Sequence, residues 1–326
     1  MTMTKRFLMG ASVAAAMTIT GAAHAQSYPT RPITVIIPFA GGSASDVVSR
    51  IMFNKMSQSL GQPIVVENRP GAGGNSGTQL AAKAAPDGYT LVGAGSGPIA
   101  ANLELYKSLG YDPLKELNII SPFASFTIVV TASNKLGIKT VKELIERAKK
   151  EPGALNYGSV GIGSSQHLAG EYFAQVTGVK MTHVPYRNIG QFGPDLISGQ
   201  VQLGFQWYPN VAGPINANGA TALAVAGDVR LGALPDTPTT TQAGLPQYQV
   251  DGWFALAAPA GVPAPIMQRL NKELNDALND PAVKAGFEKA GAVPIGRGLE
   301  QAKKFHADEI VKYRDIITKA GIAKIE

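Results

Sequence analysis

The sequence predicts an α/β protein made of two αβ domains with a cleft between them. Apolar strands, glycine-rich turns and amphipathic helices follow one another repeatedly from Arg31 onward, and this alternation is typical of parallel sheets covered by helices. Two apolar extended segments, 122–131 and 252–259, lie on either side of a second αβ series. At 326 residues the chain is long enough for about two domains. We therefore expect one αβ domain inserted into another.

The first domain is expected to begin with a buried parallel strand over residues 33–39, because this run is nearly all apolar and rich in β-branched residues. A turn of glycine and serine ends the strand, and apolar residues then recur at helical spacing until Gly61 stops the helix. The later elements follow the same pattern, with a strand at 64–67, a long glycine turn at 71–77, a short helix at 78–85 and a strand at 90–94.

The inserted domain has a helix start in Thr140-Val141-Lys142-Glu143, a capping box that opens a helix over 141–150. Its other elements are strands at 156–159, 181–184, 201–205 and 221–226 and helices at 164–177 and 191–198. Two last helices, one from Pro265 and one over about 299–319, close the first domain. Domain 1 is thus predicted to comprise residues 26–125 and 252–326, and domain 2 residues 126–251. The two extended crossovers between them allow hinge motion.

The first 25 residues have the pattern of a cleavable secretory signal peptide. Lys5 and Arg6 precede an uncharged, mostly apolar run, and Ala23-His24-Ala25 matches the small-x-small cleavage site. The alternative is a membrane anchor, but the run is short and diluted by Gly, Ser and Thr. The chain has no cysteine, hence neither disulfides nor a lipid-bearing N-terminal cysteine. We expect cleavage before Gln26 and an exported protein.

Charge and motif content argue against several functional classes. Without Lys5 and Arg6 the chain carries 27 basic and 23 acidic side chains, and it has no Lys/Arg stripe of the kind that binds nucleic acid. It has no cysteine nucleophile, no Gly-x-Ser-x-Gly elbow, no zinc-ligand spacing and no complete nucleotide-binding glycine motif. We therefore expect no nucleic-acid partner, no metal, no cofactor and no enzymatic activity.

Two glycine-rich loops are the strongest indication of a binding site. Residues 39–46 and 158–166 each leave a strand and enter a helix, so backbone N–H groups and the positive ends of two helix dipoles point toward one place. Both loops lie at the carboxyl ends of strands, where open αβ sheets bind ligands. A carboxylate or similar anion suits this arrangement. The alternative for either loop alone is that glycine serves only a tight turn.

Six segments, in order along the chain, resemble the periplasmic solute-binding proteins of tripartite tricarboxylate transporters. They are residues 32–46, 65–75, 85–90, 183–187, 234–239 and 258–263, and the resemblance extends over essentially the whole mature chain. It implies a bilobal, type II periplasmic binding fold and a small carboxylate ligand. It also implies delivery of that ligand to the membrane permease subunits of such a transporter, a location in the periplasm of a Gram-negative bacterium, and a monomer.

For the site, the resemblance implies that the two glycine loops hold one ligand carboxylate, partly through ordered water. The matching positions are Phe39, Ala40, Gly42, Ser43, Ser45 and Asp46 in the first loop and Ser159, Gly161, Ser164 and Ser165 in the second. Ser96, Gln166, His167, Tyr186, Gln206 and Trp207 complete the candidate ligand-binding residues. Because Asp46 would repel a carboxylate, we expect it to cap the helix or hold a bridging water.

Two residues bear on which carboxylate is bound, and a third, Asn188, bears on the turn next to one of them. Trp207 follows the predicted strand at 201–205, and an aromatic ring at the end of a strand can stack on a flat ligand. This favours an aromatic mono- or dicarboxylate, with terephthalate as the first candidate; the alternative is that Trp207 only packs beneath a loop. Arg187 either pairs with a distal carboxylate or lies exposed on the surface. Asn188 replaces a glycine common in the family and tolerates positive φ.

Two other functions are compatible with the same sequence. An exported hydrolase or isomerase would use Asp46 and His167 as an acid–base pair. A sensor domain would present its ligand to a membrane kinase.

Overall fold

The computed structural model describes residues 28–319 and 321–325, so the predicted signal peptide lies outside the described residues. Ten strands form one sheet in the order β2-β1-β3-β9-β4-β7-β5-β6, with β8 and β10 both paired to β4. The strands are β1 (Ile33–Ile37), β2 (Ile64–Asn68), β3 (Thr90–Gly95), β4 (Leu117–Ser133), β5 (Asn156–Ser159), β6 (Thr182–Pro185), β7 (Leu203–Trp207), β8 (Ala220–Val225), β9 (Asp251–Pro259) and β10 (Ala292–Pro294).

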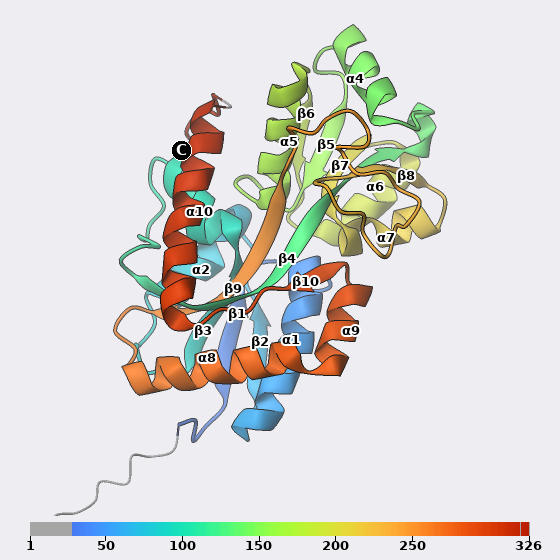
Figure 1. The fold of residues 1–326 in the computed structure, drawn as a ribbon. Helices are drawn as coiled ribbons and strands as arrows, with labels where there is room; N and C mark the ends of the chain where they lie inside the picture. Colours follow the sequence, from blue (N-terminus) through green and yellow to red (C-terminus); the bar gives the residue numbers. More distant parts are fainter. Residues whose placement is uncertain (1–27, 320, 326) are drawn as a thin grey trace, which may run out of the picture.

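Helices cover the sheet in both halves of the molecule (Figure 1). They are α1 (Ala44–Leu60), α2 (Asn75–Ala82), α3 (Asn102–Leu105), α4 (Val141–Lys150), α5 (Ser165–Thr177), α6 (Phe192–Ser198), α7 (Tyr208–Asn216), α8 (Ala264–Asn279), α9 (Pro281–Lys289) and α10 (Leu299–Lys319). Short helical turns are η1 (Ala72–Gly74), η2 (Gly97–Ala101), η3 (Asn134–Leu136) and η4 (Ile189–Gln191). Of the helices described, none is both long and apolar enough to cross a bilayer. The predicted α/β class is confirmed.

The strand β4 belongs to both halves of the sheet. Residues 117–127 pair antiparallel with β9, and residues 128–133 pair with β7 and β8. Figure 1 shows β4 and β9 side by side through the middle, with α1, α8 and α9 at the lower end, α10 along the left side, and α4 to α7 at the upper right. We call the part that contains α1 to α3 and α8 to α10 the first unit, and the part that contains α4 to α7 the second unit. The bounds predicted for two domains at 125/126 and 251/252 stay a prediction, since β4 passes the first of them without a break.

Several elements form where local sequence signals place them. Gly61 adopts the left-handed conformation, with φ 69°, at the end of α1, as a C-terminal glycine commonly does. The capping box is present in full: the Thr140 side chain accepts from Glu143 N–H, and the Glu143 carboxylate accepts from Thr140 N–H. The helix α4 has the predicted bounds, and β5 does too.

Other elements differ from the prediction. The predicted turn at 71–77 contains η1 and the start of α2, so the second helix begins at Asn75 and not at residue 78. The strand expected at 201–205 is shifted by two residues, to Leu203–Trp207. The helix α7 was not predicted, because its Pro and Gly content disfavours a helix. Pro209 lies in its first turn, where a missing N–H costs nothing.

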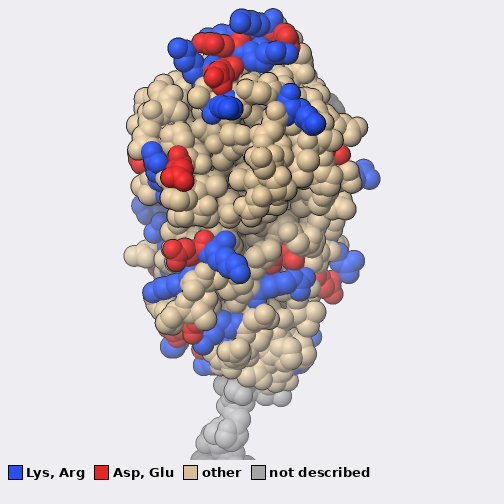
Figure 2. Space-filling model, turned by 90° about the vertical axis from the view of Figure 1, so that its right-hand side faces the viewer, with Lys and Arg blue, Asp and Glu red and all other residues tan. Residues whose placement is uncertain are grey.

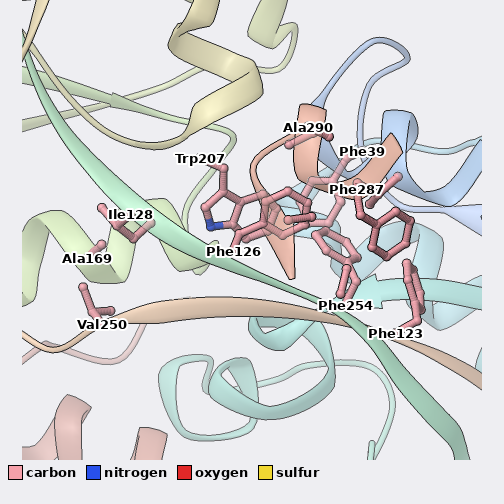
Figure 3. Close-up of a cluster of buried hydrophobic side chains, with 14 of the residues drawn as sticks. Phe39, Phe123, Phe126, Ile128, Ala169, Trp207, Val250, Phe254, Phe287 and Ala290 are labelled. Atoms are coloured by element: carbon pink, nitrogen blue, oxygen red, sulfur yellow. The ribbon is translucent and has the colours of Figure 1, made fainter. Parts of the chain in front are cut away.

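An aromatic cluster joins the two units (Figure 3). Trp207 stacks on Phe126 with ring centroids 4.7 Å apart and 17° between the planes, and its edge meets Phe254 at 5.0 Å. Phe39, which follows β1, meets Phe254 at 6.1 Å. The cluster therefore connects the end of β1 to β4, β7 and β9, and Phe39 is also the first residue of the first glycine loop.

Candidate ligand-binding site

The first glycine loop is held by a buried carboxylate. Asp46 is only 5% exposed and accepts hydrogen bonds from Gly42 N–H at 2.9 Å, from Arg50 Nε at 3.0 Å and from Asn68 Nδ2 at 3.0 Å. Burial acts to raise the pKa of Asp46, but the hydrogen bonds from Arg50, Gly42 and Asn68 outweigh it and lower that pKa below its ordinary value. The helix cap itself is Ser43, whose hydroxyl faces Asp46 N–H at 3.5 Å. Ser43 and not Asp46 is therefore the helix cap, and Asp46 instead fixes the loop that precedes the helix.

The second glycine loop is held by hydroxyl groups. Ser164 is the cap of α5: its hydroxyl accepts from His167 N–H at 3.3 Å and donates to the Gly161 carbonyl at 2.7 Å. The Ser159 hydroxyl accepts from Gly161 N–H at 3.0 Å. Both hydroxyls are buried and are used within the loop, so they shape its backbone.

The two loops meet at a small cavity of about 10 Å³, which has room for about one water molecule. Ser45 lies in the first turn of α1 and Gln166 in the first turn of α5, and neither backbone N–H has an acceptor within the part of the chain described. Both residues line this cavity, with Phe39, Ser43, Ala44, Val160, Trp207 and Asn210. The positive ends of two helices therefore converge here.

A second, larger cavity of about 600 Å³ lies between the two units. Its size is within the usual range for small-molecule sites. It shares Phe39, Ser43 and Val160 with the small cavity, so the two spaces are neighbours. The other lining residues are Pro38, Ala40, Pro70, Gly71, Ala72, Gly73, Ser76, Tyr106 and Ile325 from the first unit and Gly161, Ile162, Pro185, Tyr186, Arg187 and Ile189 from the second.

Direct contacts cross from one unit to the other beside these cavities. The Tyr106 hydroxyl donates to the Ile162 carbonyl over 2.9 Å, and the hydroxyls of Ser96 and Ser165 lie 2.8 Å apart. Asn210 accepts from Ala44 N–H at 3.2 Å. These contacts hold the two units together around the larger cavity.

The structure divides the predicted site residues into two groups. Those that line one or both cavities are Phe39, Ala40, Ser43, Ser45, Gly161, Gln166, Tyr186 and Trp207. Those that line neither are Gly42, Asp46, Ser96, Ser159, Ser164, Ser165, His167 and Gln206. The second group supports the loops: Gln206, for example, donates to the Gly158 carbonyl and accepts from Asn210. Ligand contact by either group stays a prediction.

Some lining residues were not among the predicted ones. The glycine turn predicted at 71–77 was not assigned to the site, although its density of glycine indicates close backbone approach. Gly73 lies so near the second loop that a Cβ there would be 1.8 Å from the Ile162 carbonyl oxygen. Tyr106, Asn210 and Ile325 carry no local signal that could have identified them.

Trp207 is a core side chain. It is 3% exposed, Phe126 covers one face of the indole, and a Cβ on Gly252 would lie 2.4 Å from the ring. The indole therefore packs between strands of the core, and it also lines the small cavity. Its contact with a ligand stays a prediction. Asn188 also differs from expectation: its φ is −115°, and its side chain accepts from Gly190 N–H.

Two histidines lie beside the second loop, His167 buried and His183 partly buried. The rings of His167 and His183 are 4.2 Å apart. His167 Nδ1 accepts from Gly163 N–H at 3.2 Å, and His183 Nε2 shares a 2.6 Å hydrogen bond with the Ser159 hydroxyl. Burial lowers the pKa of His167 to about 4, and burial together with the neighbouring His167 lowers the pKa of His183 to about 3. Both rings are therefore neutral at neutral pH.

The acid–base pair required by the enzyme alternative is not formed. Asp46 bonds to Gly42, Arg50 and Asn68, whereas His167 bonds to Gly163. Over residues 28–319 and 321–325, no three His, Asp or Glu side chains come together as a metal ion would require.

We expect acid to destabilise the protein through His167. The unfolded chain takes up a proton near the ordinary pKa of 6.5, whereas the folded protein leaves the ring neutral until about pH 4. Stability is therefore lost as pH falls from 6.5 toward 4, by on the order of 3 kcal/mol for this residue. Urea unfolding at pH 7 and pH 4.5 measures it. The control His167→Asn keeps an acceptor for Gly163 and should lose about 2 kcal/mol less than wild type over this interval; an equal loss in both proteins would contradict the assignment.

Comparison with known proteins gives consistent results. A family model described as "Tripartite tricarboxylate transporter family receptor" matches residues 48–322. The chain is similar to protein BugT of Bordetella pertussis, with 36% identity over 298 residues, 91% of either chain. It is also similar to an R. palustris protein solved with adipate (31% identity, TM-score 0.87, 91% of this chain and 100% of that one). A third match is MatC from Rhodopseudomonas palustris with bound malate (30% identity, TM-score 0.84, 89% and 100%).

Proposed function

Because this chain belongs to the tripartite tricarboxylate transporter receptor family, we propose that it captures a small carboxylate in the cavity between its two units and delivers it to the transporter's membrane permease. The chain has the mixed α/β fold of periplasmic binding proteins. The observation that carries the proposal is the convergence of two helix N-termini on the small cavity that adjoins the large one. The predicted signal peptide and periplasmic location belong to the same proposal, as does a monomeric state.

The chemistry of the site suits an anion. The amides of Ser45 and Gln166 have no acceptor in the described chain, and the described lining of either cavity contains no Asp or Glu. Helix N-termini stabilise negative charge, and a single water in the small cavity can relay their hydrogen bonds to a carboxylate in the large one. We expect a ligand held in this way to be released unchanged.

Dicarboxylates are the ligand class we favour. Adipate and malate, the compounds in two similar structures, each carry two carboxylates. Phe39, Tyr106 and Tyr186 line the large cavity, so aromatic side chains other than Trp207 are available to contact a flat ring. Terephthalate therefore stays our first named candidate, beside aliphatic diacids of similar length.

On the face shown in Figure 2, the charged side chains do not suggest nucleic acid as an alternative ligand. Figure 2 shows that, on the face it presents, Lys and Arg are interspersed with Asp and Glu and form no continuous stripe. A nucleic-acid surface would concentrate basic residues on one patch. This face therefore has no basic patch of the kind that a nucleic-acid surface would present.

A thermal-shift screen tests the proposal. Protein refolded free of ligand is heated with aliphatic and aromatic carboxylates, and with the matching neutral amides as controls. At about 100 times Kd, a ligand stabilises by about 2.7 kcal/mol, which raises Tm by several degrees. We expect at least one carboxylate to do so, its amide to have no effect, and mass spectrometry to recover the ligand unchanged. If no carboxylate shifts Tm, or if the ligand is converted, the proposal is wrong.

A further inference from the structure

One cation lines the larger cavity. Among the described lining residues, Arg187 is the one with a charged side chain, and it is exposed. Its guanidinium makes no hydrogen bond, ion pair or ring contact with any residue described in the structure, whereas each of the other described arginines makes at least one. A guanidinium beside a cavity and without a protein partner is free to bind a ligand.

The residue before Arg187 is held by two hydrogen bonds. Tyr186 N–H donates to the Ser159 carbonyl over 2.9 Å, and its hydroxyl donates to Asp195 over 2.8 Å. Asp195 also accepts from Gln191 at 2.9 Å, so this carboxylate is already occupied. Position 187 is thus fixed by its neighbours, while its own side chain stays uncommitted.

Arg187 and the helix N-termini lie on different parts of the lining. Arg187 borders the large cavity alone, whereas the converging helix ends border the small one. The remaining wall of the large cavity is mostly apolar and includes Pro38, Phe39, Pro70, Ala72, Ile162 and Ile189. A ligand with negative charge at both ends and an apolar middle would match this distribution.

We propose that Arg187 binds the second carboxylate of a dicarboxylate whose first carboxylate is held by the helix N-termini through the bridging water, an inference that rests on the proposed function. A guanidinium presents two parallel N–H donors that match the two oxygens of a carboxylate, a geometry that lysine does not offer. Arg187 is therefore a specificity-determining residue, which selects diacids over monoacids of the same length.

Matched pairs of acids test this role by calorimetry: succinate and butyrate, adipate and hexanoate, terephthalate and benzoate. We expect wild type to bind at least one diacid about tenfold or more tightly than its monoacid, and R187Q to lose about tenfold in diacid affinity while its monoacid affinity stays within about twofold. R187K should lose less than R187Q. The control is R69Q. Arg69 precedes the lining residue Pro70 and pairs with Glu67, so R69Q should keep the wild-type preference for diacids.

The outcomes separate this inference from the proposed function. If wild type and R187Q bind diacids equally, or if wild type binds a monoacid as tightly as its diacid, the role of Arg187 is overturned and carboxylate capture stands. If no acid in the series binds, both are overturned. Because Arg187 is exposed and makes no hydrogen bond, ion pair or ring contact within the described chain, R187Q should melt at the wild-type temperature, which verifies that any loss of binding is not unfolding.

Discussion

Replacing Trp207 by alanine should lower the free energy of unfolding of the ligand-free protein by about 3–5 kcal/mol. The side chain is 3% exposed, stacks on Phe126 and meets Phe254, so truncation leaves a cavity between the two units. Urea unfolding monitored by circular dichroism measures the loss. Trp207→Phe keeps a ring and removes an indole N–H that has no acceptor in the described chain, so it should cost only about 1 kcal/mol.

The neighbouring aromatic residue provides the control. Tyr208 begins α7 and is only partly buried, so Tyr208→Ala should destabilise the protein by less than half as much as Trp207→Ala. If Trp207 instead stacks on a ligand, Trp207→Ala should lose little stability in the ligand-free protein and much affinity for aromatic acids. A loss of unfolding free energy below about 1 kcal/mol, together with a large loss of affinity, would favour the stacking role over the packing role.

Replacing Gly73 by alanine should reduce affinity for the best-bound carboxylate by about tenfold or more, equivalent to about 1.4 kcal/mol. A Cβ at this position would lie 1.8 Å from the Ile162 carbonyl oxygen, so the loops of the two units would have to separate. Separation would also break the nearby hydrogen bond from Tyr106 to Ile162. Calorimetry measures the affinity, and small-angle scattering of the ligand-saturated protein should show a larger radius of gyration.

The control for Gly73→Ala must reproduce backbone strain without the steric clash. Gly137 has nearly the same φ, 69° against 63°, and a Cβ there would meet nothing within 4 Å. Gly137→Ala should therefore share a stability loss of about 1 kcal/mol from the left-handed backbone while keeping wild-type affinity. Wild-type affinity in Gly73→Ala would show that close contact between these loops is not required for binding.

The repeating parts of the fold could be predicted from the sequence because their signals are local. A capping box and a C-terminal glycine mark helix ends within a few residues, and they placed α4 and the end of α1 correctly. The helix α7 was missed because tertiary packing overrides the poor helix propensity of its Pro and Gly residues. Packing of that kind is absent from any local pattern.

The site could be predicted only in part, for a related reason. The glycine loops that begin α1 and α5 were identified, since each is a strand–turn–helix signal in itself. Tyr106 and Ile325 reach the same cavity from distant parts of the chain, which only the folded topology reveals. Trp207 was expected at a strand end facing the cleft. It is the last residue of β7, but its ring packs on Phe126 and Phe254 in the core that connects the units.

Sharing β4 between the halves limits how the protein can open. A strand cannot lengthen, but it can twist and bend. One stretch of β4 pairs with β9 and the next stretch pairs with β7 and β8, so both halves are attached to the same strand. We therefore expect the protein to open by a swing or a rotation about β4. If the halves swing apart about β4, the cavity opens on the side away from this strand, and a ligand leaves there.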